Sequence, residues 1–184
     1  ALDATGSANT VVSLPFSPAG TEVFFQAMVV DGADSMVSNT VANQHLAPAT
    51  DCTALGGTLL IDTIITAADS PCTLVDDMII SPDATLTIDQ GVEVNVAGDF
   101  VIDVKGGLNV TGSEASPVKF QSSLVAPTAG AWTGLFFDET GTGDLNWTQI
   151  SHAYYGVEVE ETALTMANST IRASEYGAYL YSPS

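Results

Sequence analysis

The sequence predicts an all-β chain whose larger part is a β-solenoid with coils of about 21–22 residues. Two observations predict it: a self-match at a constant spacing of 21 residues, and short β-rich runs among which no amphipathic helix stands out. The matched pairs are Ile150 and Ile171, Tyr155 and Tyr176, Gly156 and Gly177, Val157 and Ala178, and Val159 and Leu180. This period is too long for a hairpin and too short for a propeller blade, but it suits one coil stacked on the next.

Residues 1–47 have a different pattern, that of short antiparallel strands. The expected strands are Thr10–Leu14, Glu22–Val30 and Met36–Ala42, separated by prolines and by a turn at residues 31–34. The stretch S-L-P-F-S-P-A-G-T-E-V-F-F-Q-A-M-V-V-D, followed by S-N-T-V, resembles the last strands of domains in large bacterial surface proteins. The resemblance implies a partial β-sandwich-like or strand-exchange segment, with residues 48–55 as a linker.

Residues 56–184 carry the solenoid pattern. Short β-rich runs broken by turn residues would also fit a β-sandwich. However, Leu135 and Phe137 lie 22 positions before Val157 and Val159, which extends the repeat to three coils. The expected strands are Met78–Ile80, Thr85–Ile88, Val92–Val96, Phe100–Val104, Leu108–Val110, Val118–Phe120 and Trp132–Phe137.

Four motifs occur in order along this part of the chain. They are G-G-T-L-L-I-D-T-I-I-T from residue 56, G-G-L-N-V-T-G at 106–112, P-V-K-F at 117–120 and W-T-G-L-F-F at 132–137. Their order resembles that of secreted bacterial and archaeal right-handed parallel β-helix proteins, the pectate-lyase-like solenoids. The resemblance implies a right-handed parallel β-helix over residues 56–184. No cap follows the last matched coil, so we expect the solenoid to be incomplete at its C-terminal end.

Alternation along the strands predicts which side chains enter the core. The expected inward residues are Leu86, Ile88, Val92, Val94, Val96, Leu135, Phe137, Val157, Val159, Ala178 and Leu180. The glycines expected at corners, where a positive φ or a close approach is needed, are Gly91, Gly98, Gly106, Gly107, Gly156 and Gly177.

The charge of the chain limits its partners. Against 22 acidic residues stand Lys105, Lys119 and Arg172, for a net charge of −19. Nucleic acid and anionic lipid both require a basic patch, so we expect neither nucleic-acid binding nor direct membrane insertion. Such acidity suits solubility in brine or the binding of divalent cations.

Cys52 and Cys72 lie 20 positions apart, about one coil. In an extracellular protein they would form a disulfide across the first coil, and two buried free thiols are the alternative. With only two distant histidines, they make no zinc site. Cysteine use and composition together predict a secreted protein, extracellular or at the cell surface.

Outward positions of the last matched strands predict two columns of side chains. Phe136, Glu158 and Tyr179 would form one, and Asp138, Glu160 and Tyr181 its neighbour. Aromatic rings beside carboxylates on a flat sheet can bind sugars or another partner, and the alternative is a ladder of side chains that only covers the sheet.

Calcium is the one cofactor that the composition suggests, because it prefers hard oxygen ligands. Its candidate ligands are Asp76, Asp77, Asp138, Glu139 and Asp144, with Glu158, Glu160 and Glu161 as a further acidic group. Three glycosylation sequons begin at Asn109, Asn146 and Asn168.

An enzyme and a scaffold remain as hypotheses. A lyase for acidic polysaccharides would need more basic residues than this chain has. A hydrolase needs two carboxylates, for which Glu158 and Glu160 are candidates with His152 as an acid or base. We expect an extracellular structural protein without catalytic activity, such as a stalk, adhesin or filament subunit. It would bind same-chain neighbours or further subunits by end stacking or strand exchange. The alternative is a carbohydrate-binding or glycoside-hydrolysing β-helix module.

Overall fold

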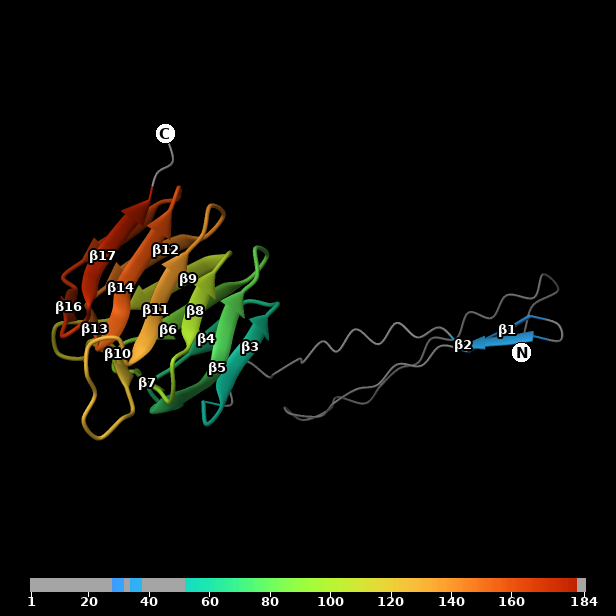
Figure 1. Ribbon diagram of the computed structural model, residues 1–184, viewed down its shortest axis with the longest axis horizontal. Helices are drawn as coiled ribbons and strands as arrows, with labels where there is room; N and C mark the ends of the chain where they lie inside the picture. The colour runs from blue at the N-terminus through green and yellow to red at the C-terminus, as the bar shows by residue number, and fades with distance from the viewer. Residues whose placement is uncertain (1–27, 32–33, 38–51, 182–184) are drawn as a thin grey trace. The chain divides into compact units, whose positions relative to one another are not determined.

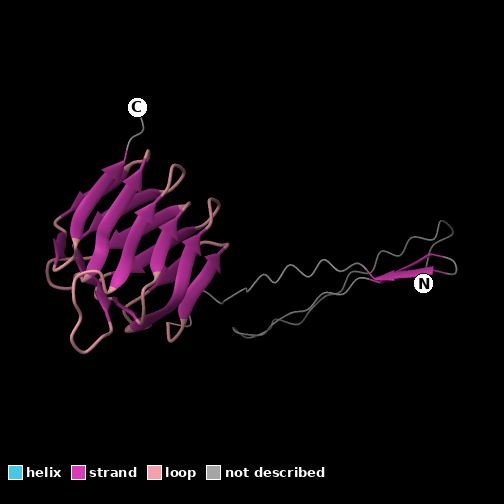
Figure 2. Cartoon of the chain, in the orientation of Figure 1, coloured by secondary structure: helices cyan, strands magenta, loops and turns pink. Residues whose placement is uncertain are grey.

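The computed structural model describes residues 28–31, 34–37 and 52–181, and all regular structure in them is β-strand (Figures 1 and 2). By its internal contacts the chain divides into two units, Ala1–His45 and Leu46–Ser184. In the first unit, β1 (Met28–Asp31) and β2 (Asp34–Val37) pair antiparallel with Asp31 opposite Asp34, so the predicted turn at residues 31–34 is confirmed. The predicted strand Thr10–Leu14 and residues 48–51 of the predicted linker lie outside the described residues.

The second unit is a parallel β-solenoid with three faces, here called sheets A, B and C (Figure 1). Sheet A contains β3 (Leu55–Leu59), β5 (Cys72–Ile80), β8 (Val101–Val104), β11 (Trp132–Phe137), β14 (Ala153–Glu160) and β17 (Tyr176–Tyr181). Sheet B contains β4 (Thr63–Ile65), β6 (Thr85–Asp89), β9 (Gly107–Thr111), β12 (Thr142–Asn146) and β15 (Leu164–Ala167). Sheet C contains the first part of β5, then β7 (Glu93–Val96), β10 (Val118–Ser122), β13 (Thr148–Ser151) and β16 (Thr170–Arg172). The predicted parallel β-helix is confirmed.

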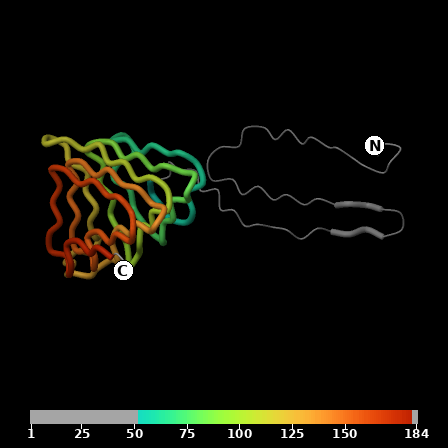
Figure 3. Tube along the Cα trace, turned by 90° about the horizontal axis from the view of Figure 1, so that it is seen from above, coloured from blue at the N-terminus to red at the C-terminus, as the bar shows by residue number. Residues whose placement is uncertain are grey.

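Each complete coil supplies one strand to each sheet, and Figure 3 shows the coils following one another along the stack. Strand β5 bends between two faces, because Cys72–Leu74 pair with β7 of sheet C and Met78–Ile80 pair with β8 of sheet A. The strands of one sheet lie about 4.8 Å apart, so residues at equivalent positions stack in columns along the solenoid.

The register predicted by the repeat is confirmed. Ile150 pairs with Ile171, and β14 pairs with β17 at a spacing of 21 residues throughout. Between β11 and β14 the spacing changes from 21 to 22, because Gly134 pairs with Tyr155 but Leu135 pairs with Val157. A bulge of one residue in β14 therefore explains why the sequence repeat is not constant.

The core is a single stack of apolar side chains inside the three sheets. Its largest fully buried members are Trp132, Phe120 and Phe137. The predicted inward residues from Leu86 to Val159 are all buried, at 5% exposure or less. Because apolar burial contributes about 25 cal/mol per Å², this stack supplies most of the stabilisation.

At several corners between sheets, a residue other than glycine adopts the left-handed backbone conformation, with a positive φ. Trp147 and Asn168 have φ values of 51° and 55° where the chain passes from sheet B to sheet C. His152 and Ala173 have φ values of 64° and 53° where it passes from sheet C to sheet A. Each pair is one repeat apart, so the same corner geometry recurs in consecutive coils.

The prediction that Gly156 and Gly177 lie at corners is wrong, because both lie inside strands, whereas Gly107 is the first residue of β9, directly after the corner from sheet A to sheet B. Gly156 is required there for a different reason. A Cβ atom on it would lie 2.3 Å from Cγ2 of Ile171 and 2.5 Å from the carbonyl oxygen of Gly177. The next coil approaches too closely for a side chain.

The prediction that Ala178 and Leu180 are in the core is also wrong. Both keep the predicted register above Val157 and Val159, but both are exposed, and Leu180 is 74% accessible. They belong to the last described coil, on which nothing in the described residues stacks.

The disulfide between Cys52 and Cys72, which are 20 positions apart in the sequence, is confirmed. Both side chains are buried against the first coil. Cys52 lies three positions before Leu55, the last residue of the predicted linker, at which β3 begins.

Candidate functional site on sheet A

The predicted column of Phe136, Glu158 and Tyr179 exists on the outward side of sheet A. Phe136 pairs with Glu158, and Glu158 pairs with Tyr179, in three successive strands. In the neighbouring column Glu160 pairs with Tyr181. Asp138 lies just beyond the end of β11, where its carboxylate accepts a hydrogen bond from Lys105.

Four tyrosine side chains pack together, and one of them, Tyr179, belongs to this column. The ring of Tyr155 lies 5.2 Å from the rings of both Tyr176 and Tyr179, measured between centroids, with interplanar angles of 30° and 35°. Tyr154 meets Tyr155 edge-on at 4.7 Å and Tyr176 at 5.5 Å. Such tilted and edge-to-face pairs are the favoured arrangements of aromatic rings, so the four rings form one connected surface.

The acidic side chains of Glu158 and Glu160 lie on this surface and affect its titration. Partial burial raises the pKa of Glu158, and the neighbouring charge of Glu160 raises it further. Partial burial also raises the pKa of Tyr155, with smaller contributions from Tyr154 and Glu158. Each shift means that the charged form is disfavoured there.

A lysine on the same sheet is held by two carboxylates. The ammonium group of Lys105 donates a hydrogen bond of 2.9 Å to Oδ2 of Asp138 and lies 3.2 Å from Oδ2 of Asp103. Hydrogen bonds to Asp138 and then Asp103 raise the pKa of Lys105. Burial alone would raise the pKa of Asp138, but hydrogen bonds from Lys105 and Thr140 outweigh it and hold that pKa below its ordinary value.

We expect Asp138→Asn to lower the free energy of unfolding by about 0.5–1 kcal/mol at neutral pH, because the ion pair is partly solvated. A carboxylate whose folded-state pKa is depressed stabilises the fold above its unfolded pKa of about 3.9 and loses that contribution as pH falls through the folded value. The difference between the two proteins should therefore shrink as pH drops below about 4. Urea unfolding at a series of pH values measures it. Asp144→Asn, at an exposed position on β12, is the control, because Asp144 has no ion pair among the described residues, and it should change the free energy of unfolding little at neutral pH.

Two of the candidate calcium ligands have other partners. Oδ1 of Asp77 accepts a hydrogen bond of 3.0 Å from the backbone of Val101, and Asp138 binds Lys105. Across residues 52–181 no group of three or more His, Cys, Asp or Glu is arranged to hold a metal ion. Calcium binding stays a prediction.

The three sequons lie on sheet B or at its end. Asn109 is exposed on β9, Asn146 ends β12, and Asn168 follows β15. The side-chain amide of Asn168 donates a hydrogen bond of 3.0 Å to Oδ1 of Asn146. Glycosylation of these positions also stays a prediction.

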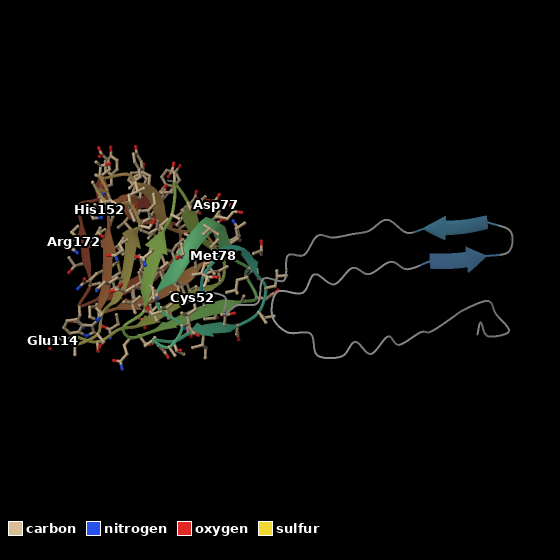
Figure 4. The ribbon with its side chains drawn as sticks, turned by 90° about the horizontal axis from the view of Figure 1, so that it is seen from below. Cys52, Asp77, Met78, Glu114, His152 and Arg172 are labelled. Atoms are coloured by element: carbon tan, nitrogen blue, oxygen red, sulfur yellow. A yellow bond between two sulfur atoms is a disulfide. The ribbon has the colours of Figure 1, made fainter. Side chains whose placement is uncertain are left out.

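His152 lies at the corner before β14, toward the end of the solenoid at which Figure 4 also labels Arg172. Its Nδ1 atom is buried and has no hydrogen-bond partner in the described part of the chain. Six residues along an extended strand separate it from Glu158, about 20 Å, so the two groups are not placed to share a proton transfer.

The sequence repeat marks Tyr155 and Tyr176 only as equivalent positions, and it predicts no role for Tyr154. A compositional signal was available, because all five tyrosines of the chain lie between residues 154 and 181. That they form one surface depends on the pairing of β14 with β17.

No family model, no curated protein and no solved structure matches this chain. The class that the fold defines is a parallel β-solenoid with one disulfide, and that disulfide indicates an oxidising, non-cytoplasmic setting. The described residues contain no helix that is long and apolar enough to cross a membrane.

Proposed function

We propose that this protein is a secreted or cell-surface structural protein without catalytic activity, in which the solenoid forms part of a stalk, adhesin or filament. The observation that carries the proposal is the contrast between the last two coils. Leu145, Ile150 and Val159 are 0%, 0% and 5% exposed under the coil that follows them. Leu180, stacked on Val159, is 74% exposed.

The edge formed by β15, β16 and β17 has the two features that a stacking contact needs, apolar side chains and unpaired backbone groups. Its apolar side chains include Leu164, Met166 and Ile171, each only partly buried. Each of these strands is the last in its row among the described residues, so its outer backbone groups are open to another strand. A further coil, from this chain or from another subunit, would bury this edge as the last coil buries the one before it.

A size measurement of the full chain tests the proposal. We expect concentration-dependent assembly, seen by sedimentation and electron microscopy, and we expect Leu180→Asp to abolish it because the substitution would place a charge in the stacking row. Thr165→Asp, an exposed outward position on β15, is the matched control and should assemble normally. Repeating the measurement with a chelator tests the calcium prediction. A chain that stays monomeric at every concentration would contradict stacking between subunits.

The two glycines of the repeat provide a second test. Gly156→Ala should cost about 1–3 kcal/mol of unfolding free energy through overpacking. Gly177→Ala should cost far less, because no atom lies within 4 Å of the Cβ position there. If a coil stacks on β17, Gly177→Ala should instead block assembly, since the incoming backbone would occupy the place that β17 occupies over Gly156. Equal stabilities for the two variants would argue against this view of the last coil.

The second candidate is a carbohydrate-binding or glycoside-hydrolysing module, favoured by the column of Phe136, Glu158 and Tyr179. Glu158 and Glu160 are alternate residues of one strand with Cα atoms about 7 Å apart, and the raised pKa of Glu158 is in the direction that a general acid needs. Glu158→Ala and Tyr179→Ala should then abolish glycan binding in an array. Unchanged binding would remove this candidate.

A further inference from the structure

All five tyrosines of the chain lie on two neighbouring parallel strands. We call them the tyrosine face: Tyr154, Tyr155, Tyr176, Tyr179 and Tyr181. A surface ladder that only covers a sheet would not need one residue type gathered in this way. The grouping has no counterpart elsewhere in residues 52–181.

Four of the rings, those of Tyr154, Tyr155, Tyr176 and Tyr179, contact one another, yet much of the tyrosine face is open to solvent. Tyr154, Tyr176, Tyr179 and Tyr181 are 43–48% exposed. The backbone N–H of Gly130 donates a hydrogen bond to the carbonyl of Ala153, which places the end of the loop at residues 123–131 beside Tyr154. The tyrosine face is therefore bordered on one side by this loop. It lies on the outward side of sheet A, where stacking of another coil would not cover it.

The tyrosine face also carries negative charge, and none of the ion pairs among the described residues involves Glu158 or Glu160. Glu158 pairs in register with Tyr179, and Glu160 with Tyr181. The described contributions to the electrostatics of Glu158 and Tyr155 come from burial, carboxylates and other tyrosines, and none comes from a basic residue. Lys119 and Lys105 are engaged elsewhere, with Glu93 and with the pair Asp103 and Asp138.

We propose that the tyrosine face binds a basic segment of a protein partner, whose lysine or arginine side chains lie over the tyrosine rings and pair with Glu158 and Glu160. The faces of aromatic rings attract ammonium and guanidinium groups. The net charge of −19 would speed the encounter with a basic partner and repel an acidic one. A neutral glycan could use the rings but would leave the two carboxylates without a counter-charge, so charge complementarity favours the basic partner.

Fluorescence anisotropy of labelled hexalysine with the full chain tests this proposal. We expect Glu158→Gln and Tyr179→Leu each to weaken binding by about fivefold or more. Tyr179→Phe should retain most of the affinity, because it keeps the ring. The matched control is Asp144→Asn, which removes one negative charge at an exposed position on β12. Salt screens a charge at that distance from the tyrosine face, so the affinity should change less than about twofold.

Three results would overturn the proposal. One is equal weakening by Asp144→Asn, which would mean diffuse attraction to an acidic protein. Another is no measurable binding of hexalysine. The third is binding of neutral hexasaccharides that Tyr179→Leu abolishes while hexalysine neither binds there nor competes, which would assign the surface to glycans. Circular dichroism of each variant confirms that the β-structure is retained.

Discussion

Replacing Phe120 by alanine should lower the free energy of unfolding by about 3–5 kcal/mol. Its ring is fully buried in the middle of β10, stacked in register between Val94 of β7 and Ile150 of β13. Coils above and below hold the backbone in place, so the cavity cannot close by local collapse, and the lost contacts are not recovered. Urea unfolding of the full chain measures the difference.

Gln121→Ala is the control for this substitution. Gln121 is the next residue on the same strand, points outward and donates a hydrogen bond of 3.1 Å to Asn95. Its loss should cost about 0.5–1.5 kcal/mol, as for a typical side-chain hydrogen bond. If the two variants were equally stable, the inward and outward assignment of β10 would be wrong.

Removing the disulfide should lower the free energy of unfolding by about 3 kcal/mol in the chain-entropy model. The bond closes a loop of 20 residues that spans the first coil, with Cys72 fully buried and Cys52 only 5% exposed. Without it the start of the first coil would be held only by the pairing of β3 with β5 and of β4 with β6 among the described strands. Unfolding curves with and without reductant measure the effect.

A double variant, Cys52→Ala with Cys72→Ala, supplies the control because reductant should not change its stability. The double variant should also unfold at the same denaturant concentration as the reduced wild-type protein. Wild-type stability that is unaffected by reductant would instead support the alternative of two buried free thiols.

The sequence by itself determined the solenoid and its register. In a stack of parallel coils, equivalent positions lie directly above one another, so a repeat in the sequence is also a repeat in space. The pairing of Val159 with Leu180 and of Phe136 with Glu158 could therefore be predicted by counting residues. The disulfide followed in the same way, because a spacing near one coil length brings two cysteines together.

Only the tertiary structure decided whether each repeated position is buried under a neighbouring coil or exposed. Gly156 and Gly177 occupy the same place in the repeat, but one lies under a neighbouring coil and the other lies open. Val159 is buried and Leu180 exposed for the same reason. Alternation within a strand depends on local geometry and is visible in the sequence, whereas burial depends on whether another coil is present.

The candidate site shows the same division. The columns on sheet A were predicted from the repeat, but the ion pair of Asp138 with Lys105 was not. The two residues follow neighbouring strands, β11 and β8, but they are 33 positions apart in the sequence, so a repeat of 21–22 residues does not bring them together. The tyrosine face also required the structure, since residues around position 155 and around position 179 become one surface only through the pairing of β14 with β17. The sequence determined the order of the strands and the facing of their side chains; contacts between coils decided which of those side chains are buried, paired or free to meet a partner.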